Sequence, residues 1–226
     1  MSNEKTVVHL LRHGEVHNPE GVLYGRRDGF HLSELGTRMA DRIGEALGPR
    51  DIVHMRSSPL ERAQETAAPL AAARGLTPVL DPRVIESANK FEGINFGGGA
   101  KTFLKNPALL RHLYNPLKPS WGEPYDEISG RMMAAVEDAR DAARGHEAVV
   151  VSHQLPIWTT RLFLEKRFYL HHPKNRQCTL CSVTSLHFEG DHLRQVVYSE
   201  PAGDLIPVGD RSAPFSAGGA KPDDRP

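Results

Sequence analysis

The sequence predicts an α/β protein, a three-layer α/β/α sandwich around a mostly parallel sheet, with an inserted cap region. Two observations support this fold class. Short β-branched apolar runs, typical of buried strands, alternate along the chain with segments whose apolar residues recur at helical spacing. Residues 82–125 follow neither period and contain three consecutive glycines and several prolines, as expected of an inserted cap.

The first half of the chain alternates strands and helices. Residues 6–11 form a β-branched apolar run that ends in a charged cluster, which is typical of a buried strand. Ser33 is a favourable N-cap for a helix that extends to Gly48 with apolar residues on one face. The remaining elements of this half are a strand at 51–55, a helix at 60–74 and a weaker strand at 77–80.

The second half repeats the pattern after the cap. Residues 126–144 have the apolar face of a helix, and residues 148–152 form the clearest buried strand. Pro156 stands where the first turn of the next helix should begin. Two further strands, at 183–188 and 192–198, flank a turn and predict a hairpin.

These elements predict one domain at residues 1–200, with the cap inserted at about 82–125. From residue 201 the chain is rich in Gly, Pro, Ser and Asp, so we expect residues 201–226 to form a weakly ordered tail.

Charge and hydropathy narrow the function classes. The 28 basic residues balance 28 acidic ones, which argues against nucleic acid as a partner because binding its backbone needs a basic face. No apolar run is long enough to cross a membrane and no signal peptide is visible, so we expect a cytoplasmic protein without a membrane partner.

Chemically active side chains follow the ends of the predicted strands. Arg12 and His13 follow the first strand, Arg62 lies in the helix after the second, and His153 and Gln154 follow residues 148–152. Because ligands of such sheets bind beyond the carboxyl ends of the strands, these groups should meet at one edge. Guanidinium and imidazole groups together suit a dianionic phosphoryl group.

The motifs resemble those of a known family. Residues 11–15, Leu-Arg-His-Gly-Glu, resemble the signature of the histidine phosphatase superfamily, also called the phosphoglycerate mutase-like family. Further segments agree with the family in order and spacing, namely residues 25–28, 32–36, 58–67 and 149–153. The resemblance covers residues 6–155 and implies the same three-layer fold.

The resemblance implies an enzyme of the phosphatase branch, a histidine acid-type phosphatase (a phosphoric monoester hydrolase). His13 would take the phosphoryl group from a small-molecule phosphomonoester and pass it to water. Arg12, Arg62 and His153 would neutralise the phosphoryl oxygens, so no metal and no cofactor is expected. The family includes monomers and dimers, so a homodimer is compatible with the resemblance.

The proton donor and two binding residues match the family less closely. Glu86 fits the usual position of the donor, but Glu92 competes with it because the spacing after Glu86 departs from the pattern. Asn18 lies one residue nearer the nucleophile than the family's phosphate-binding asparagine, and Asn-Pro is also an ordinary turn signal. Gln154 replaces the usual glycine after the second histidine and could contact substrate.

Glu123 and the two cysteines each allow two interpretations. Glu123 resembles part of a family Gly-Glu-Ser segment, and either contacts substrate or caps the following helix. Cys178 and Cys181, with His171-His172 nearby, could suggest zinc, but one such pair is weak evidence and small buried residues are the simpler interpretation.

Two other functions share the same residues. A cofactor-dependent phosphoglycerate mutase would return the phosphoryl group to a sugar acid, but it needs an arginine-rich insertion that residues 90–125 lack. A pseudoenzyme would bind phosphoesters without turnover, and Gln154 and the altered spacing after Glu86 are the reasons to consider it.

Overall fold

Six strands form one mixed sheet in the computed structural model, which describes residues 4–95, 107–112, 115, 121–170 and 176–206. The strands are β1 (Lys5–Arg12), β2 (Ile52–Ser57), β3 (Val79–Leu80), β4 (Glu147–Ser152), β5 (Val183–Glu189) and β6 (His192–Ser199). Their order in the sheet is β3-β2-β4-β1-β5-β6. The first four are parallel, whereas β5 pairs antiparallel with β1 and with β6, which confirms the predicted hairpin.

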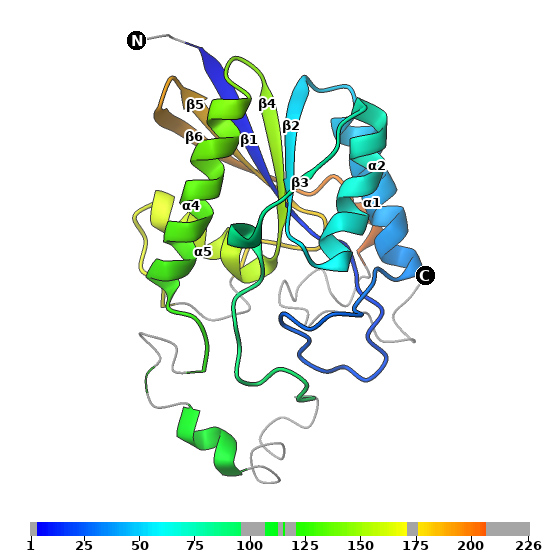
Figure 1. Ribbon diagram of the computed structural model, residues 1–226, viewed down its shortest axis with the longest axis vertical. Coiled ribbons are helices and arrows are strands. Elements are labelled where there is room, and N and C mark those ends of the chain that lie inside the picture. Colours follow the sequence, from blue (N-terminus) through cyan, green and yellow to red (C-terminus); the bar gives the residue numbers. More distant parts are fainter. Residues whose placement is uncertain (1–3, 96–106, 113–114, 116–120, 171–175, 207–226) are drawn as a thin grey trace.

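Helices cover both faces of this sheet, as Figure 1 shows. The four α-helices of the described residues are α1 (Glu34–Leu47), α2 (Glu61–Arg74), α4 (Tyr125–Ala142) and α5 (Gln154–Leu164). One apolar core joins α1 and α2 to the sheet, and a second core on the opposite face joins α4 and α5 to it. The predicted three-layer α/β/α sandwich is therefore confirmed.

The element ends differ from the predictions by a few residues. β3 shrinks to Val79–Leu80, at the edge of the sheet, where both side chains are exposed and gain little by pairing. Three short 3-10 helices complete the described structure, η1 (Pro82–Val84), η2 (Pro107–His112) and η4 (Gly203–Leu205). Among the described residues, no helix is both long and apolar enough to cross a membrane.

The cap and the tail lie partly outside the described residues. Of residues 82–125, those at 96–106, 113–114 and 116–120 are outside, and the rest connects η1 to α4 below the sheet in Figure 1. The tail prediction is wrong for residues 201–206, because Ala202 and Ile206 are buried in the core beneath α1 and α2. Residues 207–226 lie outside the described part.

β1 and β4 are the central strands, and their pairing brings the two histidine motifs together. In their parallel register Leu11 lies opposite Val151 and Arg12 opposite Ser152. The amide of His13 continues this pairing by donating to the carbonyl of Ser152 at 3.1 Å. His13 and His153 therefore leave the sheet at the same edge.

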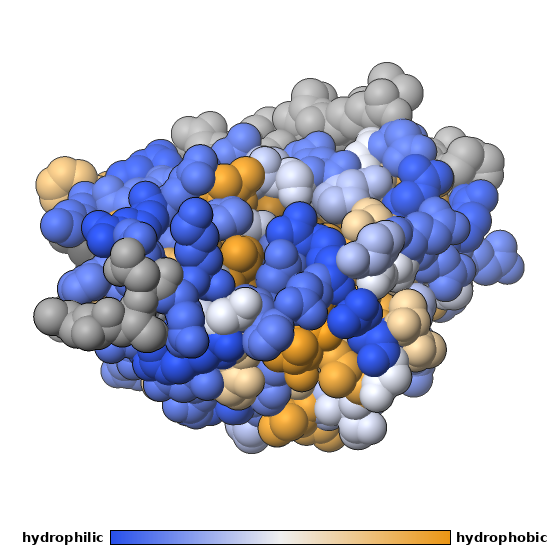
Figure 2. Space-filling view, turned by 90° about the horizontal axis from the view of Figure 1, so that it is seen from above, coloured by the Kyte–Doolittle hydropathy of each residue, from blue (hydrophilic) through white to orange (hydrophobic). Residues whose placement is uncertain are grey.

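A second polar cluster, the amino-end cluster, lies toward the opposite ends of β1 and β4 and consists of the buried His9 and Ser185, the partly buried Glu147 and the exposed Arg50. His9 bonds Ser185 Oγ through Nδ1 at 2.8 Å and Glu147 Oε2 through Nε2 at 2.9 Å. Arg50 donates to both carboxylate oxygens of Glu147, at 2.6 and 2.7 Å. Figure 2, which views this end of the molecule, shows a mainly hydrophilic surface with small groups of apolar side chains.

Candidate active site

The four predicted residues Arg12, His13, Arg62 and His153 gather beyond the carboxyl ends of β1, β2 and β4, and together we call them the phosphoryl pocket. All four side chains are buried, with exposed fractions of 0–2%. The imidazole rings of His13 and His153 lie 5.1 Å apart between centroids. Both arginines lie close enough to His13 to lower its pKa electrostatically.

His13 is held in one tautomer by its neighbour. Its Nδ1 lies 2.8 Å from the carbonyl oxygen of Gly14, which can only accept, so Nδ1 carries the proton. The lone pair of the neutral ring is then on Nε2. Burial, together with the charges of Arg62 and Arg12, lowers the pKa of His13 well below its ordinary value. The His13 ring is therefore neutral at neutral pH, with its lone pair on Nε2.

The turn after His13 requires glycine for steric reasons. A Cβ on Gly14 would lie 2.8 Å from the carbonyl oxygen of Gly36, closer than such atoms approach. The Gly14 amide donates to Thr66 Oγ1 at 3.0 Å, and Thr66 in turn donates to the carbonyl of Arg62 at 2.6 Å. This chain of contacts couples the turn after His13 to helix α2, which carries Arg62.

Arg12 and Arg62 each keep guanidinium N–H groups available. Arg12 donates one hydrogen bond to the carbonyl of Cys178 at 2.7 Å, and Arg62 donates one to the carbonyl of Gly25 at 2.7 Å. Arg12 Nε and Arg62 Nε and Nη1 are buried without a partner among the described residues. Buried donors are normally paired, so these groups are suited to receive an anion.

His153 faces the same pocket with one nitrogen. Its Nε2 lies 2.8 Å from Ser58 Oγ, and its Nδ1 is buried without a partner among the described residues. Burial, together with the charges of Arg62 and Arg12, lowers the pKa of His153 well below its ordinary value. With Ser58 donating to Nε2, Nδ1 would carry the proton and offer a further neutral donor.

Tyr24 is a pocket residue that the sequence interpretation missed. Its buried ring lies under the Arg62 guanidinium, 4.6 Å from centroid to carbon, and edge-on to His13 at 6.4 Å. Phe30 stacks on its other side at 5.1 Å. An aromatic residue directly before Gly25, at the start of a motif segment, was the available signal.

The structure separates the two candidate proton donors. Burial raises the pKa of Glu86, whose charge interacts with Arg62 and Arg12. Glu92 instead accepts from the amides of Arg26 at 3.1 Å and Asn89 at 3.4 Å. Glu86 therefore has the surroundings of a proton donor, whereas Glu92 joins two loops.

Asn18 and Gln154 are both engaged with nearby groups. Asn18 donates through Nδ2 to the carbonyl of Val22 at 2.8 Å and accepts through Oδ1 from the amide of Val22 at 3.2 Å, which holds a turn. Gln154 donates to the carbonyl of Cys178 and accepts from Arg176, each at 3.3 Å. Arg176, which the sequence interpretation missed, interacts electrostatically with Glu86 and Arg12.

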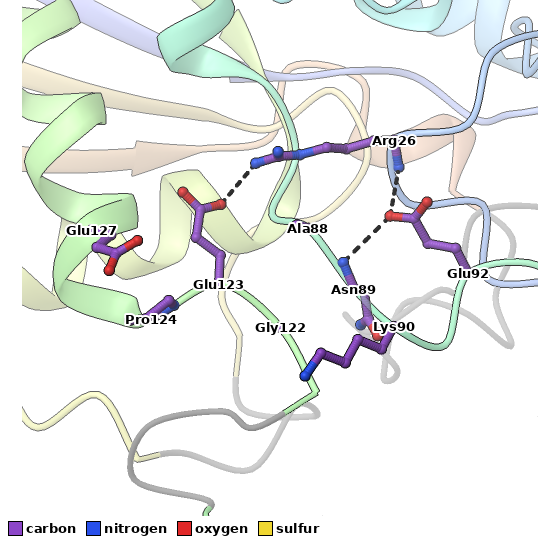
Figure 3. Close-up of a pocket in the computed structure, with 9 residues that line it drawn as sticks. All are labelled: Arg26, Ala88, Asn89, Lys90, Glu92, Gly122, Glu123, Pro124 and Glu127. Atoms are coloured by element: carbon purple, nitrogen blue, oxygen red, sulfur yellow. Dashed lines mark hydrogen bonds and ion pairs between the residues drawn. The ribbon is translucent and has the colours of Figure 1, made fainter. Parts of the chain in front are cut away.

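A cavity of about 590 Å³ lies beside the segment that follows Glu86. It is lined by Arg26, Ala88, Asn89, Lys90, Glu92, Gly122, Glu123, Pro124 and Glu127. Figure 3 shows the Arg26 guanidinium reaching Glu123, while the Glu92 carboxylate accepts from the backbone amide of Arg26. Helix α4 has no side-chain cap, so the capping interpretation of Glu123 is wrong.

The cysteines are buried and free, on opposite faces of the sheet. Cys178 belongs to the core under α4 and α5, and Cys181 to the core under α1 and α2. Burial raises the pKa of the Cys181 thiol to about 12. His171 and His172 lie outside the described residues; among those that are described, no group of three His, Cys, Asp or Glu side chains could hold a metal ion.

Comparison with known proteins places this geometry in a family. Residues 8–201 match the family model described as the histidine phosphatase superfamily (branch 1). The chain is 54% identical over 199 residues to the uncharacterized protein Rv0525 of Mycobacterium tuberculosis (strain ATCC 25618 / H37Rv), which covers 88% of this chain and 98% of that protein.

Two further comparisons agree with this assignment. The probable phosphoglycerate mutase GpmB of Yersinia pestis (strain Pestoides F) is 30% identical over 166 residues, or 66% of this chain and 70% of GpmB. The solved structure of mycobacterial glucosyl-3-phosphoglycerate phosphatase Rv2419c has the same fold, with a TM-score of 0.65 at 24% identity over 86% of this chain and 96% of that one. This chain therefore belongs to the histidine phosphatase superfamily.

Proposed function

We propose that this protein is a phosphoric monoester hydrolase of the histidine acid type, which hydrolyses a small organic phosphate through a phosphohistidine at His13. The observation that supports this most strongly is the hydrogen bond from His13 Nδ1 to the carbonyl of Gly14, at 2.8 Å. This bond leaves the lone pair on Nε2. The surrounding pocket is buried and contains two arginines whose free N–H groups have no partner among the described residues.

The reaction would proceed in two displacements at phosphorus. In the first, His13 Nε2 attacks phosphorus, the bond to the ester oxygen breaks, and that oxygen takes a proton from the Glu86 carboxyl. In the second, water attacks the phosphohistidine, the carboxylate of Glu86 accepts its proton, and the P–N bond breaks to release phosphate. Arg12, Arg62 and His153 would neutralise the non-bridging oxygens in both steps.

The charges of the site fit these roles. The lowered pKa of His13 keeps it neutral for attack, and the raised pKa of Glu86 favours the protonated acid. Because the arginines supply the positive charge at phosphorus, the proposed reaction needs no metal ion. The cavity of about 590 Å³, whose lining includes Ala88, two residues after Glu86, is large enough to receive the organic part of a small phosphomonoester.

Phosphate release from a panel of phosphomonoesters, measured in the presence of EDTA, tests the proposal. The native protein should release phosphate, His13→Ala should fall to background, and the control His17→Ala, at an exposed position four residues along, should match the native protein. Equal release by native protein and His13→Ala would overturn the assignment of the nucleophile.

The similarity to GpmB supports a second candidate, a phosphoglycerate mutase. Exchange between 2- and 3-phosphoglycerate that outpaces phosphate release would favour it over the phosphatase. Tight binding of phosphoesters with neither reaction would instead favour a non-catalytic binding protein.

A further inference from the structure

Two arginines from distant parts of the chain hold the backbone on either side of the proposed proton donor. Arg26 Nε donates to the carbonyl of Glu86 at 2.6 Å, and Arg131 Nη2 reaches the same oxygen at 3.5 Å. Arg131 Nη1 also donates to the carbonyls of Arg83 at 2.5 Å and Ile85 at 2.7 Å. Three carbonyls in four residues are thus fixed by guanidinium groups.

Glu123 joins these two arginines. Its Oε1 accepts from Arg131 Nε at 2.8 Å, and its Oε2 accepts from Arg131 Nη2 at 3.0 Å and from Arg26 Nη2 at 2.8 Å. The contact between Glu123 and Arg26 is visible in Figure 3. The side chains of Glu123 and Arg131 are only 14% and 16% exposed. A bidentate carboxylate–arginine pair of this kind fixes orientation as well as distance.

Glu86 needs such support because no helix or strand holds it. The 3-10 helix η1 ends at Val84, and the residues that follow up to Asn89 are irregular. The Glu86 carboxylate accepts from the amide of Ser87 at 2.8 Å, a contact within its own loop. A general acid must stand within hydrogen-bond distance of the leaving oxygen, so a small displacement of this loop would be costly.

We propose that Glu123, Arg131 and Arg26 form a clamp that positions Glu86 for proton transfer to the leaving group. The inference rests on the proposed function, in which Glu86 is the acid. The two arginines contact the backbone of residues 83–86 and Glu123 joins them, so all three are positioning residues for Glu86. Arg131 is the member of the clamp that does not line the cavity.

The nature of the leaving group separates this role from a purely structural one. An alkyl phosphate releases a strongly basic alkoxide, which needs a proton from Glu86 as it leaves. p-Nitrophenyl phosphate releases a stable phenolate, which leaves without one. Loss of the clamp should therefore slow release of the leaving group selectively from the alkyl ester, whereas general damage to the fold would slow both esters. Glu86 also serves the second displacement, which is the same for both esters, so the comparison uses kcat/KM, to which only the first displacement contributes.

The test compares Glu123→Gln and Arg131→Gln with Glu86→Gln, on p-nitrophenyl phosphate and on an alkyl phosphate that the native protein hydrolyses. We expect both clamp variants to lower kcat/KM on the alkyl ester by roughly 10²-fold. On p-nitrophenyl phosphate kcat/KM should fall less than about three-fold. Glu86→Gln should show the same selectivity, and adding Glu123→Gln to it should cause little further loss.

The matched control is Glu189→Gln, the same substitution in the exposed ion pair with Arg194 on the β5–β6 hairpin, 2.8 Å long. It should leave both reactions unchanged. Equal losses on the two esters in the clamp variants, or full additivity with Glu86→Gln, would overturn the clamp. If Glu86→Gln itself hydrolyses both esters at the native rate, the proposed role of Glu86 fails instead.

Discussion

Strand β1 carries a polar cluster toward each end, and the two clusters differ in how their charges are balanced. In the amino-end cluster both nitrogens of His9 have partners, and the Glu147 carboxylate pairs with Arg50. In the phosphoryl pocket, Arg12 and Arg62 form no ion pair with any carboxylate of the described residues, and several of their N–H groups lack partners there. The first cluster is electrostatically complete, and the second is not.

This difference teaches how to distinguish a structural cluster from a binding site. A buried charge is costly unless it is paired, so the folded chain gains stability from the completed cluster and loses some to the incomplete one. A protein keeps unpaired buried charges where a ligand of opposite charge pairs with them on binding. A phosphoryl dianion has the charge and geometry to pair with two arginines. The two ends should therefore respond oppositely to substitution.

The largest expected effect comes from replacing Arg62 by methionine, a side chain of similar length without charge. We expect kcat/KM for any phosphomonoester substrate to fall by roughly 10²–10³-fold, because a donor to the phosphoryl oxygens is lost. The free energy of unfolding should rise by about 1 kcal/mol, because a buried unpaired charge is removed. Steady-state kinetics and urea unfolding measure the two quantities.

If Arg62→Met lost both activity and stability, the proposed difference between the two clusters would be wrong. Arg62 would then be contributing more through its contacts with Gly25 and Tyr24 than its charge costs. The control Arg194→Met, at an exposed position on β6, should change neither quantity appreciably.

Glu147→Gln, in the amino-end cluster, should have the opposite effect to Arg62→Met: it should lower the free energy of unfolding and leave activity almost unchanged. Although burial acts to raise it, hydrogen bonds from His9 and Arg50 lower the pKa of Glu147 to about 2. A carboxyl with a lowered pKa stabilises the fold above its unfolded pKa, so the variant should lose roughly 2–3 kcal/mol of unfolding free energy at pH 7. Its kcat/KM should stay within two-fold of the native value.

The pH dependence makes this prediction sharper. As pH falls from about 4.5 toward 2, the native carboxyl becomes protonated and the stability difference between native protein and Glu147→Gln should shrink. Urea unfolding at a series of pH values measures it. A difference that stays constant over this range would mean that the stabilisation does not come from the ionised carboxylate.

The sequence predicted the phosphoryl pocket better than its surroundings, for physical reasons. Arg12, His13 and His153 directly follow apolar strands whose parallel pairing is forced by burial, so their convergence follows from the fold. The partners of Glu86 could not be foreseen, because Glu86, Arg26 and Glu123 lie in irregular segments whose path has no period, although Arg131 lies in the predicted helix α4. The burial of Ala202 and Ile206 could not be predicted either. The composition of the tail shows that it is polar on average, but it does not show that two of its apolar residues pack into the core.

The smallest expected effect concerns Tyr24. This residue contacts the unpaired charge of Arg62 but adds no charge of its own to the pocket. Its ring lies under the Arg62 guanidinium at 4.6 Å, and a buried cation–π contact contributes about 1–2 kcal/mol. Tyr24→Leu should therefore lower kcat/KM by about five- to ten-fold, through a less ordered Arg62. Tyr24→Phe keeps the ring and should stay within about two-fold of the native protein, with kinetics read at a temperature where both variants are folded. If Phe is as harmful as Leu, the hydroxyl is the important group, and Tyr24 acts on the bound phosphoryl group directly and not by ordering the arginine.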